Sequence, residues 1–243
     1  FQVFSLEGLR TVTEEGVEFR SHIDGSTRFL SPERAVEIQW TLGPDVAMAF
    51  DHVVPGQSGR AEVEDALART ERWLVRARDR HAELLRVAGA GLDRQALVPI
   101  VQGGIFKDLR RSAMEGILGV ADWRAVAVGG LSVGEPKHQM QIVLEDLQMV
   151  LPPAVPRYLM GVGFPEDIGG AVGRGMDLAD CVAPTRMGRN GTAFTDAGPV
   201  NIRNARYRDS DAPLDAGCDC ETCVTFSRGY LRQGRGDRQG ALA

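Results

Sequence analysis

The sequence predicts an α/β protein built on a parallel sheet, and two observations support this fold class. Short apolar runs alternate along the chain with longer amphipathic segments, as expected for repeated β-α units. Each of five apolar runs ends at a glycine or a polar side chain, in chain order Asp51, Gln102, Gly130, Gly161 and Asp180. Because the carboxyl ends of parallel strands share one edge of a sheet, we expect these residues to face one site.

Turn and capping signals define the N-terminal elements. Residues 18–30 are expected to form a hairpin closed by Asp24-Gly25, a pair that favours tight turns. Ser31 then has the position of a helix cap, Pro32 lies in the first helical turn, and Gly43 ends the helix.

The remaining elements follow the β-α alternation. The strands are expected at 46–50, 97–101, 125–128, 157–160 and 178–182. The helices are expected at 62–88, at 106–118, at 136–149 and from Pro165 onward. Both an open doubly wound sheet and a (β/α) barrel fit this pattern, but a closed eight-stranded barrel requires strands outside this sequence. The chain starts at Phe1 rather than Met, and we expect both of its ends to be truncated.

The composition is that of an ordinary soluble globular protein. Of its 243 residues, 43% are hydrophobic and 25% are charged, and a chain of this length can bury one large core. The apolar runs are too short to span a membrane, and the N-terminus lacks the features of a signal peptide. Four cysteines, three of them clustered, favour a reducing cytoplasmic compartment over a disulfide framework. The net charge of −5 does not by itself indicate a polyanionic partner.

Two carboxylates at strand ends suggest chemistry on a glycosidic bond. Asp51 and Asp180 follow different apolar runs, and Gln102 follows a third. One carboxylate can act as a nucleophile while the other acts as an acid, a base or a ligand clamp. The competing interpretation is that each aspartate caps a helix or forms a salt bridge.

Two other motifs carry weaker signals. Gly161-Val162-Gly163 resembles the start of a dinucleotide fingerprint, but Glu166 stands where the third glycine is needed, so a tight strand-to-helix turn is the better interpretation. Residues 184–191 are expected to form a polar loop with two arginines, suited to phosphate or base contacts or simply to a solvated surface.

The segment CDCETC, at 218–223, is the strongest single signal. Its cysteines, Cys218, Cys220 and Cys223, have a spacing suited to three corners of a tetrahedral zinc site. All four histidines and Cys181 lie upstream of the segment. Three interpretations remain: the segment does not bind zinc, a distant residue supplies the fourth ligand, or the chain ends before that ligand. Redox-active or incidental thiols are the alternative to a metal site.

Ten collinear motifs resemble the tRNA-guanine transglycosylase family, whose members are also called queuine tRNA-ribosyltransferases. The motifs run from Phe1-Gln2-Val3 to the cysteine segment and cover nearly the whole chain. The others are FRSHIDGS (19–26), LSPE (30–33), MAFD (48–51), VQGG (101–104), VGGLSVGE (128–135), YLMGVG (158–163), DCVAPTRMGRNG (180–191) and NIRNARY (201–207).

The resemblance implies a (β/α)8 TIM barrel that here lacks its N-terminal strands and has an inserted zinc-binding subdomain. Residues 1–200 would form a partial barrel carrying the active site, and residues 201–243 a partial zinc-binding subdomain. In this family three cysteines bind structural Zn²⁺ together with a histidine further along the chain. The resemblance therefore implies that the fourth ligand lies beyond this sequence, and that a general acid/base aspartate precedes Phe1.

The resemblance also implies a pentosyltransferase of queuosine biosynthesis. Such enzymes exchange the wobble guanine of tRNAs with GUN anticodons for a 7-substituted deazaguanine. Asp180 is implied to attack the ribose and form a covalent aspartyl-ribosyl intermediate, while Asp51, Gln102 and the Gly130 N–H bind the polar edges of the base. The other implied base-binding residues are Phe1, Leu131, Glu135 and Met160, and the implied binders of the tRNA anticodon loop are Arg186 and Arg189.

The incoming base depends on two positions. Val53 stands where bacterial members of the family usually carry Cys and eukaryotic members carry Val. Val133 is the bacterial residue at a place where queuine users carry Gly. The sequence thus favours 7-aminomethyl-7-deazaguanine, with queuine as the alternative.

The resemblance further implies a cytoplasmic homodimer with no membrane association. The alternative functions are a non-catalytic, zinc-containing tRNA-binding module and the non-catalytic partner subunit of eukaryotic enzymes. The partner subunit should lack the nucleophile, whereas Asp180, Asp51 and Gln102 are all present. A barrel glycosidase would explain the carboxylates but not the cysteines.

Overall fold

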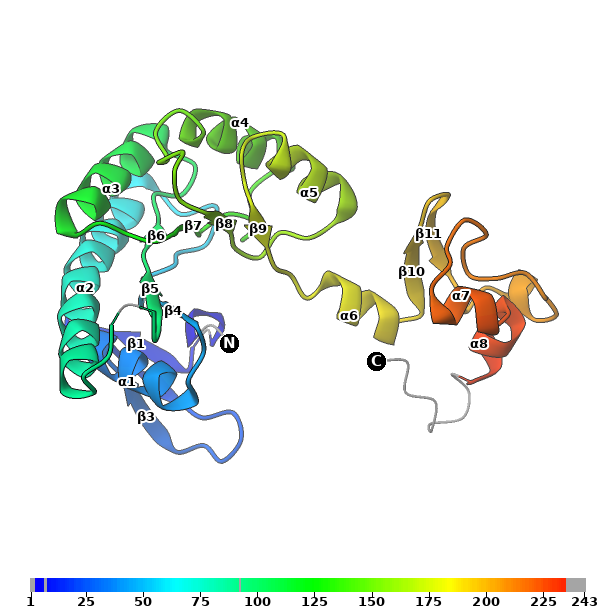
Figure 1. The fold of residues 1–243 in the computed structure, drawn as a ribbon, viewed down its shortest axis with the longest axis horizontal. Coiled ribbons are helices and arrows are strands. Elements are labelled where there is room, and N and C mark those ends of the chain that lie inside the picture. The colour runs from blue at the N-terminus through cyan, green and yellow to red at the C-terminus, as the bar shows by residue number, and fades with distance from the viewer. Residues whose placement is uncertain (1–2, 7, 92, 235–243) are drawn as a thin grey trace. The chain divides into compact units, whose positions relative to one another are not determined.

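The computed structural model describes residues 3–6, 8–91 and 93–234 and divides the chain into two compact units. The first unit is Phe1–Asp180 and the second is Cys181–Ala243 (Figure 1). Residues 181–200 thus belong to the second unit, although the sequence-based boundary at 200/201 grouped them with the barrel.

An antiparallel sheet opens the first unit, after the short 3₁₀ helix η1 (Val3–Ser5). It has the order β1 (Arg10–Val12), β2 (Val17–Arg20) and β3 (Thr27–Leu30). The predicted hairpin at 18–30 is confirmed: Glu18 pairs with Phe29, and the Asp24 carboxylate accepts a 3.1 Å hydrogen bond from the Ser26 N–H in the turn. Strand β1 was not predicted, because three residues are too few for a periodic pattern.

Helix α1 (Pro32–Leu42) has the predicted caps. The Ser31 hydroxyl accepts a 3.1 Å hydrogen bond from the Arg34 N–H. Gly43 adopts a φ of 74°, which only glycine reaches without strain, and its N–H bonds the Gln39 carbonyl at 3.0 Å.

The predicted parallel strands are all present. Their bounds are β4 (Val46–Met48), β5 (Ala96–Val98), β6 (Ile100–Val101), β7 (Val126–Val128), β8 (Arg157–Leu159) and β9 (Leu178–Ala179). β4 pairs with β5, and β6, β7, β8 and β9 pair in that order, all in parallel. The run expected at 97–101 is split in two by Pro99, which has no N–H to donate, but its carbonyl still accepts from the Ala127 N–H at 2.9 Å.

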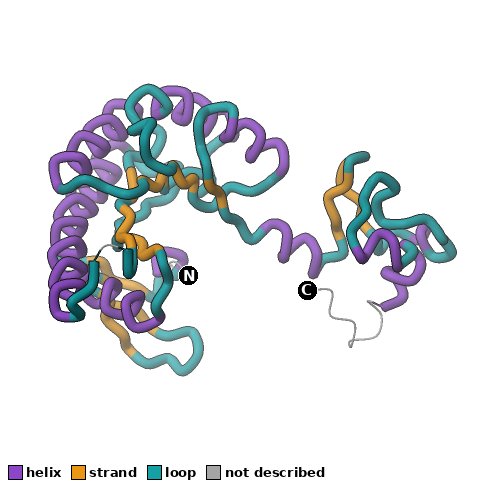
Figure 2. The backbone as a smooth tube through the Cα atoms, viewed as in Figure 1, coloured by secondary structure: helices purple, strands orange, loops and turns teal. Residues whose placement is uncertain are grey.

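Each crossover between parallel strands contains a helix, and these helices lie along the outside of the strands (Figures 1 and 2). Their bounds are α2 (Arg60–Val87), α3 (Lys107–Val120), α4 (Lys137–Leu147) and α5 (Pro165–Val172). This arrangement is compatible with part of a (β/α) barrel.

The core lies between the strands and these helices. In β7, Val126 and Val128 pack against the helix layer, and Ala127 packs on the opposite side with Val98 and Ile100. Because both faces of β7 are buried, its sequence is continuously apolar rather than alternating.

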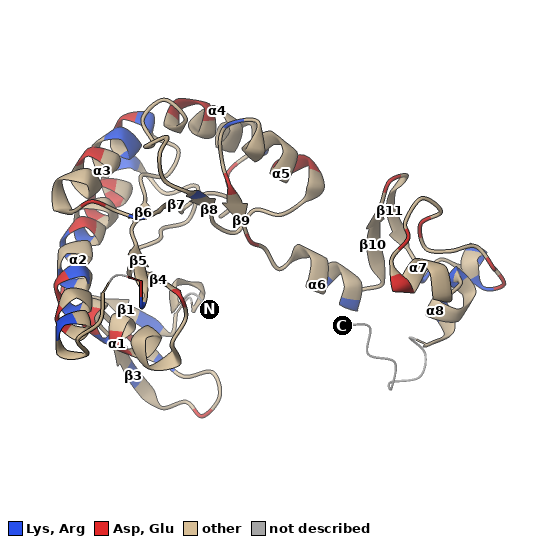
Figure 3. Ribbon diagram, viewed as in Figure 1, with Lys and Arg blue, Asp and Glu red and all other residues tan. Residues whose placement is uncertain are grey.

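Helix α2 also fastens the N-terminal sheet to the helix layer. Trp73 is fully buried, stacks on Phe50 at 4.9 Å, and donates a 2.7 Å hydrogen bond to the Glu14 carbonyl. Arg76 pairs with Glu33 at 2.6 Å. Figure 3 shows that basic and acidic side chains are interspersed along this helix, as such cross-links require.

The second unit has its own small core. Its elements are α6 (Ala183–Arg189), β10 (Thr192–Thr195), β11 (Gly198–Asn201), η2 (Ala205–Tyr207), α7 (Glu221–Thr225) and α8 (Arg228–Gly234). The buried residues Val200, Ile202, Tyr207 and Leu231 form its apolar centre.

The prediction of a loop at 184–191 was wrong, since most of this segment is helix α6. Pro184 suits the first turn of a helix, and Gly191, at a φ of 80°, follows its end. None of the helices in the described ranges is long and apolar enough to cross a membrane.

Candidate active site and metal centre

A cavity of about 160 Å³ lies at the carboxyl ends of the parallel strands. Its walls are formed by Asp51 and Val53 after β4, Gln102 after β6, residues 129–133 after β7, and Met160 and Gly161 after β8. Pockets for drug-sized ligands are typically about 300–1,000 Å³, so this cavity suits a small ring system. Four of the five predicted strand-end positions thus line one cavity.

The cavity contains a short hydrogen bond between two of its predicted side chains. The Gln102 amide donates to the Asp51 carboxylate at 2.5 Å. Burial raises the pKa of Asp51 to about 6, although the hydrogen bond from Gln102 acts in the opposite direction. Asp51 is therefore largely ionised at neutral pH, at an energetic cost to the folded state.

Two glycines after β7 make room for Gln102. A Cβ at Gly129 would lie 2.6 Å from the Gln102 amide nitrogen, and one at Gly130 only 2.2 Å from its oxygen. Gly130 also has a φ of 61°. The backbone after β7 can approach the Gln102 side chain this closely only because both residues are glycine.

Asp180 lies at the rim of the same cavity. Its Oδ1 atom accepts hydrogen bonds from the Tyr158 hydroxyl at 2.7 Å and from the Gly161 N–H at 2.9 Å, and Gly161 itself lines the cavity. Within the described residues the Oδ2 atom of Asp180 forms no hydrogen bond or ion pair. One carboxylate oxygen is thus anchored and the other is available.

Tyr158 is a residue of this site that the sequence analysis missed. Burial, and then the hydrogen bond to Asp180, raise the pKa of the Tyr158 hydroxyl, which therefore stays protonated and remains a donor. The sequence placed it in a strand and at the start of the YLMGVG motif, two residues before Met160, but neither position assigned its side chain to the site.

Glu135 shapes the loop that follows β7. Its carboxylate accepts hydrogen bonds from the N–H groups of Ser132 and of Val133, the latter at 3.0 Å. Ser132 has a φ of 60°, which is uncommon for a residue other than glycine. Glu135 therefore holds the backbone beside Leu131 and Val133, both of which line the cavity.

Phe1, a predicted base-binding residue, is outside the described residues. His52 was not a predicted site residue, and it does not line the cavity although it follows Asp51. Its ring packs on Phe4 at 5.1 Å, and Arg69 lies 3.0 Å from its Nδ1 atom. Burial, followed by the nearby Arg69 and Arg10, lowers the pKa of His52 to about 4, so the imidazole is neutral at physiological pH.

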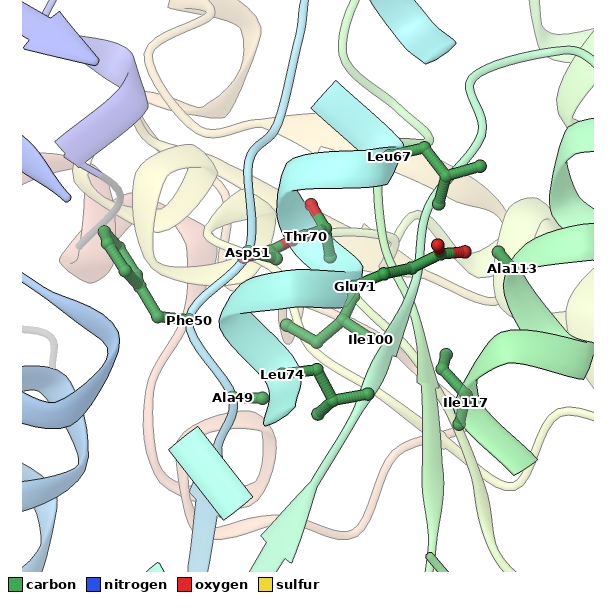
Figure 4. A pocket seen from close by; sticks show the side chains of 10 residues that line it. All are labelled: Ala49, Phe50, Asp51, Leu67, Thr70, Glu71, Leu74, Ile100, Ala113 and Ile117. Atoms are coloured by element: carbon green, nitrogen blue, oxygen red, sulfur yellow. The ribbon is translucent and has the colours of Figure 1, made fainter. Parts of the chain in front are cut away.

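A second, internal cavity lies between α2, α3 and the loop after β4, behind Asp51 (Figure 4). Its volume is only about 10 Å³, the space of roughly one water molecule. Most of its lining is apolar, including Leu67, Leu74 and Ile117, and we therefore interpret it as a packing gap rather than a ligand site.

The predicted cysteine cluster is assembled in the second unit. The sulfur atoms of Cys218, Cys220 and Cys223 all lie within 4.8 Å of one another. Thiolates bound tetrahedrally to one zinc ion at ~2.3 Å lie roughly 3.8 Å apart, so small movements would suffice. The N–H of Cys223, followed by the neighbouring thiols, lowers the pKa of Cys220. Against the effect of the Cys220 N–H, the thiols of Cys220 and Cys223 raise the pKa of Cys218 to about 11, so of these two Cys220 is the first to form the thiolate that metals bind. These three residues could hold a metal ion, and no fourth His, Cys, Asp or Glu joins them within the described part of the chain.

The two predicted tRNA-binding arginines lie on α6 of the second unit. Arg186 and Arg189 are both exposed, and their spacing of three residues places them on one face of that helix.

Comparisons with known proteins agree on one family. A family model described as queuine tRNA-ribosyltransferase matches residues 1–239. Among curated proteins named queuine tRNA-ribosyltransferase, the chain is 51% identical to one from Solidesulfovibrio magneticus, 49% to one from Caldanaerobacter subterraneus and 48% to one from Desulforamulus reducens. In each case the similarity covers 96% of this chain and 60% of the relative, so the chain spans about three-fifths of their length.

The raised pKa of Asp51 predicts that Asp51→Asn stabilises the protein at neutral pH. The Asp51 carboxyl loses its proton near pH 6 in the folded protein, whereas an unfolded aspartate loses it near pH 3.8. The folding stability of the wild type therefore falls as the pH rises from about 4 to 6. The gain in unfolding free energy for Asp51→Asn, from urea titrations, should be near zero at pH 4 and reach about 1–3 kcal/mol at pH 8. The matched control is Asp45→Asn, at an exposed aspartate outside the cavity. A gain that does not change with pH would contradict the buried-carboxylate interpretation.

The cysteine cluster predicts a thiolate-rich metal site. Titration of the full-length protein with Co²⁺ should produce the charge-transfer absorption of thiolate ligands. Cys223→Ser should weaken Co²⁺ affinity more than about 100-fold, beyond the effect typical of outer-shell changes, because it removes a ligand. Cys181→Ser is the matched control, since Cys181 lies outside the cluster, and an equal loss in both variants would argue against the site.

Proposed function

The chain belongs to the queuine tRNA-ribosyltransferase family, and from this premise we propose that the protein exchanges the wobble guanine of GUN-anticodon tRNAs for a 7-substituted deazaguanine. The observation that carries the proposal is the cavity in which Asp51, Gln102 and Gly130 meet, with Asp180 at its rim. A purine offers N–H donors and a carbonyl acceptor along one edge, and these groups complement the Asp51 carboxylate and the amide and N–H donors around it.

In this proposal Asp180 is the nucleophile. Its free Oδ2 atom attacks C1′ of the ribose, and the bond between C1′ and the base breaks. The leaving guanine takes its proton from the general acid/base aspartate that the family carries before the position of Phe1. The ribose then carries an ester to Asp180, and the incoming base displaces the ester through its own N9 atom, which loses a proton. Two displacements at one carbon give net retention, and a single well-placed carboxylate is enough for both.

The hydrogen bonds on Oδ1 support this role. Tyr158 and Gly161 fix the orientation of the carboxylate, so that less conformational freedom is lost when the attack begins. They also stabilise the anion before reaction and the carboxylate that is expelled in the second displacement.

The base is bound by polar groups that reject other purines. The Asp51 carboxylate accepts hydrogen bonds from the N–H groups on one edge of the base. The Gln102 amide and the Gly130 N–H donate hydrogen bonds to the carbonyl oxygen of the base. A base without the matching groups leaves these buried partners unpaired, which is a strong basis for discrimination. Met160 and Phe1 are proposed to contact the faces of the ring, while the Leu131 carbonyl and Glu135 face the substituent at position 7.

The remaining assignments follow the family. Residues 1–200, a range that extends beyond the first compact unit, are proposed to form part of a (β/α)8 barrel, and residues 201–243 a zinc-binding subdomain. Cys218, Cys220 and Cys223 would hold Zn²⁺, with a histidine further along the full-length protein as the fourth ligand. The ion would have a structural role, tying the segment before α7 to the rest of the unit.

The proposed partners are tRNA and a second copy of the protein. Arg186 and Arg189 would contact the phosphates of the anticodon loop, whose target base must leave its stack to reach the cavity. The protein is proposed to act as a cytoplasmic homodimer in queuosine biosynthesis. A non-catalytic tRNA-binding module or partner subunit is the less favoured function, because neither needs Asp51, Gln102 and Asp180 around one cavity.

The nucleophile assignment predicts the behaviour of Asp180→Asn in the full-length protein. The amide retains the shape but cannot attack, so base exchange should fall by about 10⁴-fold or more and the covalent tRNA adduct should disappear from denaturing gels. Binding of tRNA should persist. Asp122→Asn, an exposed carboxylate elsewhere in the first unit, serves as the control. An adduct in Asp180→Asn would place the nucleophile elsewhere.

The cavity lining predicts the choice of incoming base. Val133 occupies space beside the cavity that the cyclopentenediol of queuine would need, so the wild type should prefer 7-aminomethyl-7-deazaguanine. Val133→Gly should improve the efficiency of queuine relative to the smaller base by about 10- to 200-fold, the usual effect of removing misplaced methyl groups. Val53→Cys, in the same cavity, should change this ratio much less. A wild type that uses queuine at least as efficiently as the smaller base would contradict the assignment.

A further inference from the structure

Arg110 is a fully buried cation, with a relative exposure of 0%, and forms no ion pair with any Asp or Glu of the described residues. It lies on α3, and its guanidinium donates hydrogen bonds only to backbone carbonyls. The acceptors are Gly104 at 2.7 Å, Val101 at 3.1 Å, Gly129 at 3.0 Å and Gly130 at 3.3 Å. A buried charge is normally costly unless it is paired or well hydrogen-bonded, so these four contacts make the site tolerable.

The four carbonyls belong to the ends of two neighbouring strands. Val101 and Gly104 flank the Gln102 segment after β6, and Gly129 and Gly130 follow β7. Arg110 therefore joins the two backbone segments that carry Gln102 and the Gly130 N–H into the cavity wall. Burial lowers the pKa of Arg110 to about 9, against the opposing effect of Glu135, so the group is still charged at neutral pH and its hydrogen bonds are charge-assisted.

The geometry of the peptide bond carries the effect into the cavity. The described peptide bonds are trans, so the N–H of each unit points opposite to its C=O. Because the Gly129 carbonyl points at the buried guanidinium, the Gly130 N–H points to the other side. Gly130 lines the cavity, whereas Arg110 does not. Within the described residues the Gly130 N–H forms no hydrogen bond.

The fit around Arg110 is close. A Cβ at Gly103 would lie 2.8 Å from the Cγ atom of Arg110, and the φ of Gly103 is 134°. Glycine at this position thus lets the arginine stem pass directly under the loop after β6.

We propose that Arg110 is a positioning residue that selects 6-oxopurines. By holding the carbonyls of Gly129 and Gly130, it keeps the Gly130 N–H aimed into the cavity as a donor to the oxygen at position 6 of the base. It does not touch the base itself. The inference rests on the proposed function, since it assumes that a purine occupies this cavity.

The test compares two free bases in the full-length protein. Guanine has a strong oxygen acceptor at position 6, whereas 6-thioguanine keeps the same N–H groups but has a weaker sulfur acceptor. In Arg110→Lys and Arg110→Met the preference for guanine over 6-thioguanine, measured as a ratio of Kd values, should fall by about two- to tenfold. Arg111→Met is the matched control: it is the next residue of the helix and pairs on the surface with Asp146, and its ratio should equal that of the wild type.

The ratio separates positioning from a loss of folding. Partial unfolding removes binding sites for both bases equally and leaves the ratio unchanged. Variants that fold, by circular dichroism, and keep the wild-type ratio would overturn the inference while leaving the proposed function intact. A wild type that binds neither base would overturn both.

A second readout needs no variant. In the ¹⁵N-labelled wild type the amide proton resonance of Gly130 should shift downfield when guanine binds, and shift less with 6-thioguanine. A Gly130 resonance that does not respond to guanine would overturn the inference even if neither Arg110 variant folds.

Discussion

Parallel hydrogen bonding from β6 to β9 is the constraint on which the site depends. In register, each strand delivers its carboxyl end to the same edge of the sheet, so that Gln102, Gly130, Met160 and Asp180 become neighbours although they are far apart in the sequence. These strands are only two or three residues long, and β6 and β7 are held by burial of both faces between the helix layer and an inner apolar cluster. The polar groups can gather at one edge because almost nothing else in the strands is polar.

The electrostatics of this edge combine a fully buried cation with an acid that is only partly exposed to water. Within the described residues Asp51 forms no ion pair, remains largely ionised and is compensated by the Gln102 amide. In the same part of the chain Arg110 remains charged without an ion pair and is compensated by four carbonyls. Neither charge neutralises the other. Such buried charges lower the folding stability, but they give the site hydrogen-bond donors and acceptors in defined positions, a trade-off common in binding pockets.

Local signals in the sequence were sufficient for much of the fold. Ser31 and Gly43 identified both ends of α1, and the apolar runs identified the parallel strands and the residues that follow them. Pro99 was visible in the sequence as a residue without an N–H, yet its consequence, two short strands instead of one, depends on which neighbours pair with it. Tyr158 and Arg110 could not be identified in advance, because a strand tyrosine and a helical arginine usually face solvent or an apolar wall. Only the three-dimensional fold shows that Tyr158 contacts Asp180 and that Arg110 contacts the loops after β6 and β7.

Asp180 is the last residue of the first unit, and a single peptide bond joins it to Cys181 in the second. The strand that precedes it, β9, has only two residues, both exposed, and within the described residues it pairs with β8 alone. The carboxylate is nevertheless tied to β8 and the turn after it, through Tyr158 and Gly161. The main chain of Asp180 is held by its neighbours in the sequence, and its side chain is held by two hydrogen bonds to residues 158 and 161. If the main chain moves at Cys181, these two hydrogen bonds still restrain the carboxylate. The position of Oδ2, the oxygen proposed to react, therefore depends on β8 and the turn after it as well as on the main chain of Asp180.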